Sequence, residues 1–565
     1  MSAGLGKVPA LQTYLDVGQG NRVFGSLYGS DLPPLGREPD CPAWEKAVNR
    51  RAASAPAEIE PFLLEDEARA HGVAVIDEAS PECVFGGADG GEGSTGRGAL
   101  EFTEATVATI RRKASSLRPR ELLVAIARPT GANDDPVAIG IAGRGVDGNL
   151  TSDSTRTDGY VLSTDVAPTV LGHFGIEVPG AMSGQAIRSE GAVDPAAIES
   201  LTARMGVISS RRGPVIGLSL LAWVVGLVLL AAVSRGGLAR AGVRLVGVSV
   251  LLLPAVLLAG AAIEPGQTLE TLLVMAGAPL LGGLVLALLG GYRALAVAAA
   301  LTITAYAVDV VVGSPLTSLS LLGPNPGLGV RFYGIGNELE ALLAVLVVAG
   351  TGAGLAGFAP RSSPRAAATA FVAVGIGAAF VFAAGRFGAD VGAAIVFPIG
   401  AAVAAAAVAA HRRRTALLVI AAPLAVLALL ALVDLVSGAN AHLTRSVLDA
   451  GGLGDLADVA QRRLQLSAHS FTRPIVFVFL PLIAALVALA IARREQLRSW
   501  VDGRPAVRAG LLGGAVATVA GTLANDSGAL LLEIGAAYLL VFVGFAWAEA
   551  PGEADRSTTL SGPCG

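Results

Sequence analysis

The pattern of hydrophobic and polar positions changes near Arg212. Before this residue, short apolar runs alternate with charged residues and prolines; after it, long apolar runs are separated by brief polar breaks. An apolar run of about 18 to 22 residues is long enough to cross the hydrocarbon core of a bilayer as a helix. The pattern therefore predicts about eleven transmembrane helices, over 214–234, 245–263, 269–290, 293–312, 337–357, 367–385, 390–410, 415–436, 474–492, 508–525 and 528–547.

The same pattern divides the chain into three regions. Residues 1–212 are expected to form an α/β domain, 213–549 an α-helical polytopic membrane domain, and 550–565 a short tail. The composition agrees, because 53% hydrophobic residues, 15% charged residues and a mean hydropathy of +0.63 are typical of lipid-facing helices. The formal net charge of −4 carries no basic excess, which argues against a nucleic-acid partner.

Arginines in the short loops predict the orientation in a plasma membrane. Positive residues are retained on the cytoplasmic side, and they recur at every second crossing: Arg235, Arg240, Arg244, Arg293, Arg361, Arg365, Arg412 to Arg414, Arg493, Arg494 and Arg498. This places the carboxyl terminus in the cytoplasm and the amino-terminal domain outside. The opening MSAGLGKVPALQTYL has no apolar signal segment, so either the true start lies upstream or the orientation is inverted. Arg211 and Arg212 favour the inverted orientation.

Strand-like runs predict the α/β character of the amino-terminal domain. VAVI at 73–76 and LLVAIA at 122–127 are separated by charged helical stretches. The glycine-rich stretch at 86–98 lacks the GK[ST] ending of a phosphate-binding loop and is interpreted as a surface loop. Cys41 and Cys83 could pair in an oxidising compartment, and three cysteines without a CxxC spacing predict no zinc site.

One segment of this domain resembles a known family. STDVAPTVLGHFGIEVPGAMSGQAI, Ser163 to Ile187, is similar to the closing segment of alkaline-phosphatase-superfamily domains, with Asp165 and Pro168 also suited to a helix start. The resemblance implies an alkaline-phosphatase-like α/β fold. Catalysis in that superfamily uses two metal ions held by Asp and His ligands.

The ligands that this resemblance requires are largely missing. The domain has two histidines, His71 and His173, and Arg128, Pro129 and Thr130 stand where an Asp-His-Gly cluster is expected. Asp134 and Asp135 could be ligands, but carboxylates in a loop of Gly, Asn and Pro are commonly turn residues. We therefore expect a degenerate, non-catalytic domain, assign no metal site, and leave the cofactor unknown.

The whole layout is also similar to two groups of membrane proteins. An alkaline-phosphatase-like domain followed by many helices resembles the ethanolamine-phosphate transferases of glycolipid anchors. It resembles still more closely actinobacterial envelope proteins that join such a domain to motifs like RFYGIGNE, at 331–338 here. These resemblances imply a cell-envelope location and a glycolipid or lipid-phosphate substrate.

Three polar motifs fall on one predicted face of the membrane domain, the outer one. They are GVRFYGIGNELEALL at 329–343, GRFGADVG at 385–392, and ANDSG at 524–528, with Glu533 further along the last helix. Glycines beside each motif allow broken helices, which membranes tolerate where the backbone is buried in protein or lines a wet cavity. Because ionisable groups inside membranes usually face a site, we predict one shared polar cavity.

Residues of these motifs are the candidate site. Asn337 and Glu340 can share a helix face, whereas Glu338 and Glu340 are about 200° apart. We assign the acidic, catalytic part of the site to Glu338, Asp390 and Asp526, and substrate binding to Arg331, Tyr333, Asn337, Glu340, Arg386 and Asn525. Arg331 and Arg386 would either neutralise the acidic residues or bind a phosphate, and the guanidinium fork suits the second role. The loop 437–473, with His442, His469 and Arg473, either covers the cavity or forms an amphipathic surface hairpin.

Three functional classes remain open, and whether the protein is an enzyme is uncertain. The first is an envelope protein that binds or acts on a lipid-linked phosphate or glycan at the outer leaflet, with membrane lipids as its partners. The second is a proton- or cation-coupled transporter or flippase of an envelope precursor. The third is a non-catalytic assembly scaffold.

Overall fold

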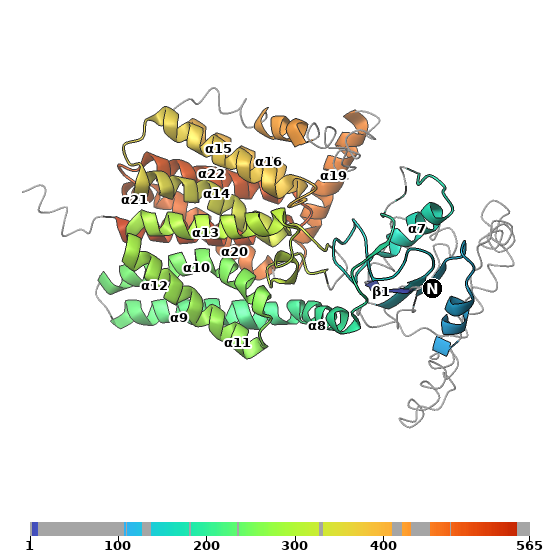
Figure 1. The fold of residues 1–565 in the computed structure, drawn as a ribbon. Helices are drawn as coiled ribbons and strands as arrows, with labels where there is room; N and C mark the ends of the chain where they lie inside the picture. Colours follow the sequence, from blue (N-terminus) through green and yellow to red (C-terminus); the bar gives the residue numbers. More distant parts are fainter. Residues whose placement is uncertain are drawn as a thin grey trace, which may run out of the picture. The chain divides into compact units, whose positions relative to one another are not determined.

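The computed structural model describes residues 3–8, 107–108, 110–126, 137–179, 182, 184–233, 237–326, 331–409, 421–430, 453–474 and 476–550. The chain separates into two compact units (Figure 1). The first contains residues 1–206 with 326–332, and the second contains 207–325 with 333–565. Predictions for Cys41, Cys83, His71, the loop 86–98, Arg128 to Thr130, Asp134, Asp135 and His442 lie outside the described residues.

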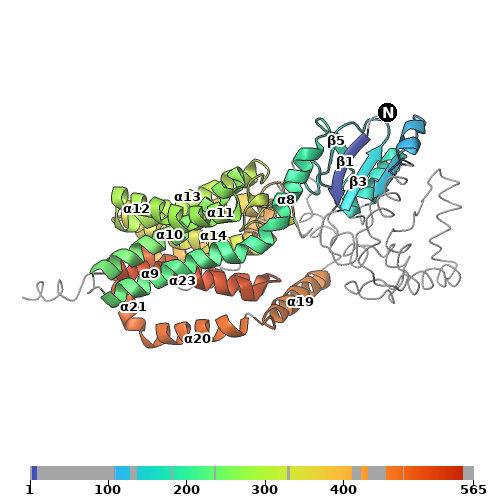
Figure 2. The ribbon, with the colours of Figure 1, turned by 90° about the horizontal axis from the view of Figure 1, so that it is seen from below.

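The second unit is a bundle of apolar helices, as Figure 2 shows from below. In the described part of the chain, nine helices are long and apolar enough to cross a membrane, and each corresponds to a predicted span. Their bounds are Pro195–Val233, Gly237–Ile263, Gln267–Leu289, Gly291–Val311, Asn337–Phe358, Pro364–Ala383, Val391–Val408, Pro505–Ala524 and Gly528–Glu549. The multi-pass membrane architecture is thereby confirmed.

The first of these helices begins earlier than predicted. It contains α8 (Pro195–Arg212), a π-helical turn η2 (Gly213–Gly217) and α9 (Leu218–Val233). Pro214 does not end the helix, because the wider turn around it accommodates a residue that lacks an N–H donor. A second π-helical turn, η3 (Leu273–Gly277), joins α11 (Gln267–Leu272) to α12 (Ala278–Leu289).

The two remaining predicted spans have a different form. The span predicted over 474–492 is α20 (Val476–Ala492), which is bent by 79° from α21 (Arg494–Trp500). Of the span predicted over 415–436, the structure describes the short apolar helix Ala421–Leu430. The described residues therefore support nine membrane helices, or ten if the bent pair counts as one span.

Helix α14 (Asn337–Phe358) is the centre of the bundle. It packs against α13 (Gly291–Val311), α16 (Val391–Val408), α22 (Pro505–Ala524) and α23 (Gly528–Glu549), and residues 339–350 are all buried. Small residues bring these backbones together: a side chain at Gly352 would meet the carbonyl oxygen of Ala506. In lipid the hydrophobic effect does not drive helices together, so helices commonly associate through close van der Waals packing at small residues.

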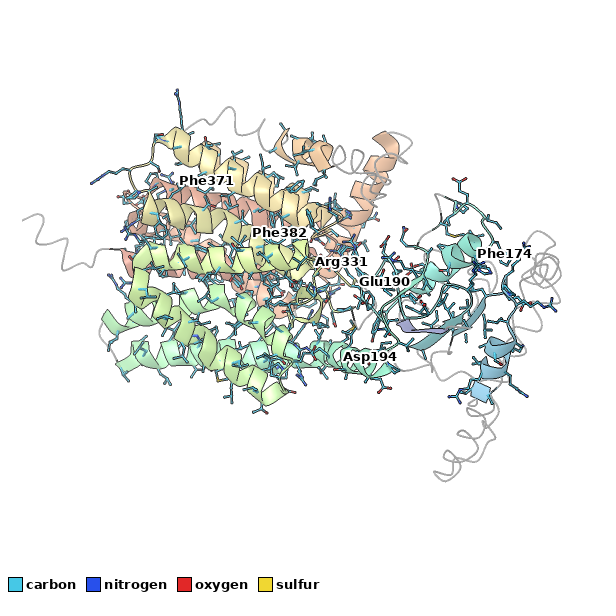
Figure 3. The ribbon with its side chains drawn as sticks, viewed as in Figure 1. Phe174, Glu190, Asp194, Arg331, Phe371 and Phe382 are labelled. Carbon is cyan, nitrogen blue, oxygen red and sulfur yellow. The ribbon has the colours of Figure 1, made fainter. Side chains whose placement is uncertain are left out.

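Aromatic residues fill the contact between α15 (Pro364–Ala383) and α16. Phe371 and Phe382, labelled in Figure 3, are both buried on α15. The ring of Phe382 meets that of Phe397 edge to face, with centroids 5.9 Å apart. This geometry is favourable between aromatic quadrupoles.

Side chains from neighbouring helices compensate for two in-helix prolines. Pro254 in α10 (Gly237–Ile263) cannot donate to the carbonyl of Val250, which instead accepts from the Tyr538 hydroxyl at 3.4 Å. Pro279 likewise cannot donate to Met275, whose carbonyl accepts from the Trp223 indole N–H at 2.9 Å. Lipid offers no water for such carbonyls, so cross-helix donors are what make these prolines tolerable.

The first unit contains a mixed sheet in the order β2 (Leu123–Ile126), β3 (Val137–Ala142), β1 (Ala3–Val8), β4 (Asn149–Thr151), β5 (Arg188–Glu190). The β1–β4 pair is parallel and the other pairs are antiparallel. Ile139, Ile141, Leu150 and Val161 form its small core. The strand predicted over 122–127 is present as β2.

Candidate functional site

The ends of three helices meet through a hydrogen-bonded network of polar side chains. The Asn525 amide nitrogen, in the break between α22 and α23, donates to Asn337 Oδ1 at 3.2 Å and to Glu340 Oε2 at 2.7 Å. Asn337 Nδ2 in turn donates to Asp526 Oδ1 at 3.1 Å. We call Asn337, Glu340, Asn525 and Asp526 the polar network.

The network runs from the surface of the unit into its interior. Asp526 is exposed, Asn337 is partly buried, Asn525 is 4% exposed, and Glu340 is 0% exposed. A buried carboxylate is costly unless polar groups stabilise it. The Asn525 amide supplies one such group, which explains why the α22–α23 break holds an asparagine at this position.

The amino end of α16 lies against the Glu340 carboxylate. A side-chain carbon placed on Gly392 would lie 2.5 Å from Oε2 and 2.6 Å from Oε1 of Glu340, so a larger residue there would require the carboxylate to shift. Asp390 is the N-cap of this helix and accepts a hydrogen bond from the Gly392 N–H at 2.9 Å. The partial positive charge of a helix amino terminus stabilises a nearby carboxylate.

Backbone contacts join the first two motifs. The Ile335 N–H donates to the Gly388 carbonyl at 2.9 Å. Gly334 has a positive φ of 79°, and a side chain on it would meet the same carbonyl. The glycines that the sequence places in both motifs therefore allow two loops to touch directly.

Glu338 faces a different partner from Glu340. Its carboxylate lies 3.0 Å from Nη1 of Arg212, and Arg212 Nη2 donates to the Gly323 carbonyl at 2.5 Å. Both side chains of this ion pair are about a quarter exposed, at 27% and 24%. Glu340 thus belongs to the same hydrogen-bonded network as Asp526, whereas Glu338 pairs with Arg212, because residues two apart on a helix point in different directions.

The three other predicted binding residues are Arg331, Tyr333 and Arg386. Arg331, labelled in Figure 3, belongs to the first unit, next to Phe332, whose ring centroid is 5.6 Å from that of Tyr160. Tyr333 is the first residue of the second stretch of chain in the second unit and is partly buried. Arg386 is exposed, with its guanidinium carbon 5.0 Å from the centroid of the Phe387 ring.

The structure also brings in residues that sequence reasoning missed. These are Arg212, Gly392, and two serines of α19 (Leu453–Ser470), Ser467 and Ser470, whose hydroxyls contact the ends of α22 and α23. Gly392 lies within the motif at 385–392, which was a usable signal, whereas nothing in the sequence connects Arg212 or these serines with the polar motifs. His469 and Arg473 are exposed, and Glu533 on α23 is partly buried, with no hydrogen bond to Oε1 from the described residues.

In the first unit, Asp165 joins several segments of the chain through hydrogen bonds. Its carboxylate accepts from the hydroxyls of Ser152 at 2.6 Å and Ser154 at 2.5 Å, and from the backbone N–H groups of Leu162 and Gln185. Burial raises the pKa of Asp165, and these four hydrogen bonds oppose that change. This arrangement gives Asp165 a structural role. His173 Nε2 lies 2.7 Å from the Arg120 carbonyl oxygen.

Within the residues that the structure describes, no group of three or more His, Cys, Asp or Glu side chains is arranged to hold a metal ion. Comparison with known proteins adds no relative: no family model, no curated protein and no solved structure matches the chain.

Proposed function

We propose that this protein is a bacterial cell-envelope membrane protein that binds the headgroup of a lipid-linked phosphate or glycan at the outer leaflet. The polar network carries the proposal, because it offers carboxylate and amide groups continuously from an exposed residue to a buried one. Carboxylates and amides together accept from and donate to sugar hydroxyls. Arg386, exposed in the neighbouring motif, is the proposed phosphate ligand.

The proposed sidedness rests on arginines at the opposite ends of the helices. Arg244 Nη2 donates to the Ala548 carbonyl and Nε lies 2.7 Å from Glu549 Oε1, while Arg293 donates to Gly357. These arginines interact with the carboxyl ends of α23 and α14, so each is also compatible with a structural role. The polar network lies at the amino ends of α14 and α23 and would therefore face outside.

The first unit is proposed to be an external, degenerate alkaline-phosphatase-like domain. The support is its mixed sheet and the hydrogen bond between Asp165 and the Gln185 N–H, both of which lie in the segment that resembles this superfamily. In this proposal the domain presents or binds envelope material without hydrolysing it.

A specific observation supports a second candidate, a proton- or cation-coupled transporter or flippase. Glu340 is fully buried in the first turn of α14, and Glu533 places a second carboxylate on α23. Intramembrane carboxylates often carry protons in transporters. In proteoliposomes, Glu340→Gln would abolish substrate-dependent proton flux if this candidate is correct.

Binding of defined lipids by the full-length protein in nanodiscs tests the first proposal. We expect native mass spectrometry to detect a polyprenyl-phosphate-linked sugar in preference to phosphatidylglycerol, with affinity reduced about tenfold by Asp526→Asn, equivalent to about 1.4 kcal/mol. Asp502→Asn is the matched control, because both aspartates are exposed and flank the two ends of α22. Equal affinity for both lipids, or equal effects of the two substitutions, would reject the proposal.

A further inference from the structure

Helix α19 contacts both sides of the break between α22 and α23. Ser467 Oγ donates to the Thr522 carbonyl at 2.6 Å, and Ser470 Oγ accepts from the Ala529 N–H at 3.0 Å. Ser470 also donates to the Ser467 carbonyl at 2.6 Å, which links the two contacts. Both serines are 4% exposed.

The Thr522 carbonyl and the Ala529 N–H are backbone groups that the break between the helices leaves without helical partners. Thr522 is in the last turn of α22, and the helix ends before residue 526 could donate to its carbonyl. Ala529 is in the first turn of α23, where N–H groups have no earlier helical carbonyl. Ser467 and Ser470 therefore supply from α19 the caps that the sequence of the break does not supply.

The packing at this contact leaves no freedom for a larger residue. A side chain on Gly528 would meet both the Ser467 hydroxyl and the Thr522 carbonyl. The three residues between the helices, 525–527, are thus held between one fixed point in α22 and another in α23. Two of them, Asn525 and Asp526, belong to the polar network.

We propose that Ser467 and Ser470 are positioning residues for the polar network, and that α19 sets the geometry with which Asn525 and Asp526 meet a ligand. The proposal builds on the ligand-binding role of the network proposed above. Without the two hydroxyls the break keeps its sequence but loses both caps, so the Asn525 amide is no longer held between Asn337 and Glu340.

Hydrogen exchange of the full-length protein in nanodiscs tests the positioning independently of any ligand. In the double variant Ser467→Ala/Ser470→Ala, amides of residues 522–530 should exchange at least tenfold faster, while amides in α14 keep wild-type rates. Thr472→Ala is the matched control, because among the described residues its hydroxyl bonds the His469 carbonyl alone, at an exposed position just after the same helix. The single variant Ser467→Thr, with Ser470 unchanged, keeps both hydroxyls. Its amides at 522–530 should exchange as slowly as in the wild type.

A second measurement separates positioning from general stability. The double variant should lower affinity for the sugar-lipid probe about tenfold, and adding Asn525→Ala should lower it little further, since the three residues act as one unit. If the wild type binds no probe, the lipid-binding role fails while the exchange result still decides whether α19 positions the break. The proposal would be overturned if residues 522–530 of the double variant exchanged at wild-type rates, or if exchange in that variant were faster throughout the bundle.

Discussion

Asn337 and Asp526 are 189 positions apart in the chain, and the amide of the first donates a hydrogen bond to the carboxylate of the second at 3.1 Å. The contact joins the first turn of α14 to the break before α23. It also connects, through Asn525, to the buried Glu340.

The hydrogen bond between Asn337 and Asp526 predicts that substitutions at these two residues have coupled effects on the stability of the bundle. Asn337→Ala and Asp526→Ala should together destabilise the bundle by less than the sum of the single changes, with a difference of about 0.5 kcal/mol because Asp526 is exposed. A double-mutant cycle on denaturant unfolding in detergent measures it, with Asp502→Ala replacing Asp526→Ala as control. Strict additivity would show that the contact contributes nothing.

The fit between Gly392 and Glu340 predicts a compensating pair. Gly392→Ala should destabilise the bundle, because the new methyl group forces the buried Glu340 carboxylate to shift away from its position beside Asn525. Glu340→Ala alone should cost about 1 to 3 kcal/mol by leaving the buried Asn525 amide without one acceptor. The combined variant should be more stable than Gly392→Ala alone. A thermal midpoint that falls further in the double variant would contradict this geometry.

Two tyrosines of α13 form a matched test of cross-helix hydrogen bonding. Tyr306 is fully buried and donates to the Pro254 carbonyl at 3.0 Å, whereas the buried Tyr292 hydroxyl has no hydrogen-bond partner among the described residues. Tyr306→Phe should destabilise by about 0.5 to 1.5 kcal/mol, and Tyr292→Phe should be neutral or stabilising. Thermal unfolding in detergent distinguishes them, and equal effects would argue against the hydrogen bonds of Tyr306 to Pro254 and with Ser320.

The environment of Asp165 predicts how the first unit depends on pH. Burial raises the pKa of this carboxyl in the folded state. Its stabilising contribution is therefore complete below the ordinary pKa of an aspartate, about 3.9, and is lost as pH rises through the higher folded-state value. Relative to Asp165→Asn, the wild type should gain protection on acidification, measured by hydrogen exchange of residues 149–165 in the whole chain. The opposite sign would mean that the four hydrogen bonds outweigh burial.

Thiol labelling tests the sidedness predicted from arginines. In a cysteine-free background, Ser200→Cys and Thr472→Cys should react with an impermeant reagent on intact cells, and Asp502→Cys should react only after permeabilisation. All three positions are exposed, so differences in reaction report on the membrane rather than on burial. Labelling of Asp502→Cys alone would invert the orientation.

The sequence by itself determined the existence and bounds of most membrane helices. Long apolar runs can satisfy their backbone groups in lipid only as helices, and this is why α14, predicted over 337–357, spans Asn337–Phe358. Helix periodicity was also enough to separate Glu338 from Asn337 and Glu340, because side-chain direction follows from position within a turn.

Tertiary structure alone decided which of these polar residues share an environment. Glu338 was grouped in the sequence with Asp390 and Asp526, but its partner is Arg212, 126 positions earlier, at the end of α8. Glu340 reaches Asn525 and the amino end of α16 because glycines on α16 and α22 let these backbones approach closely. Ser467 and Ser470 carry no local signal at all, since their role arises only where α19 meets two helix ends that are remote from it in the chain.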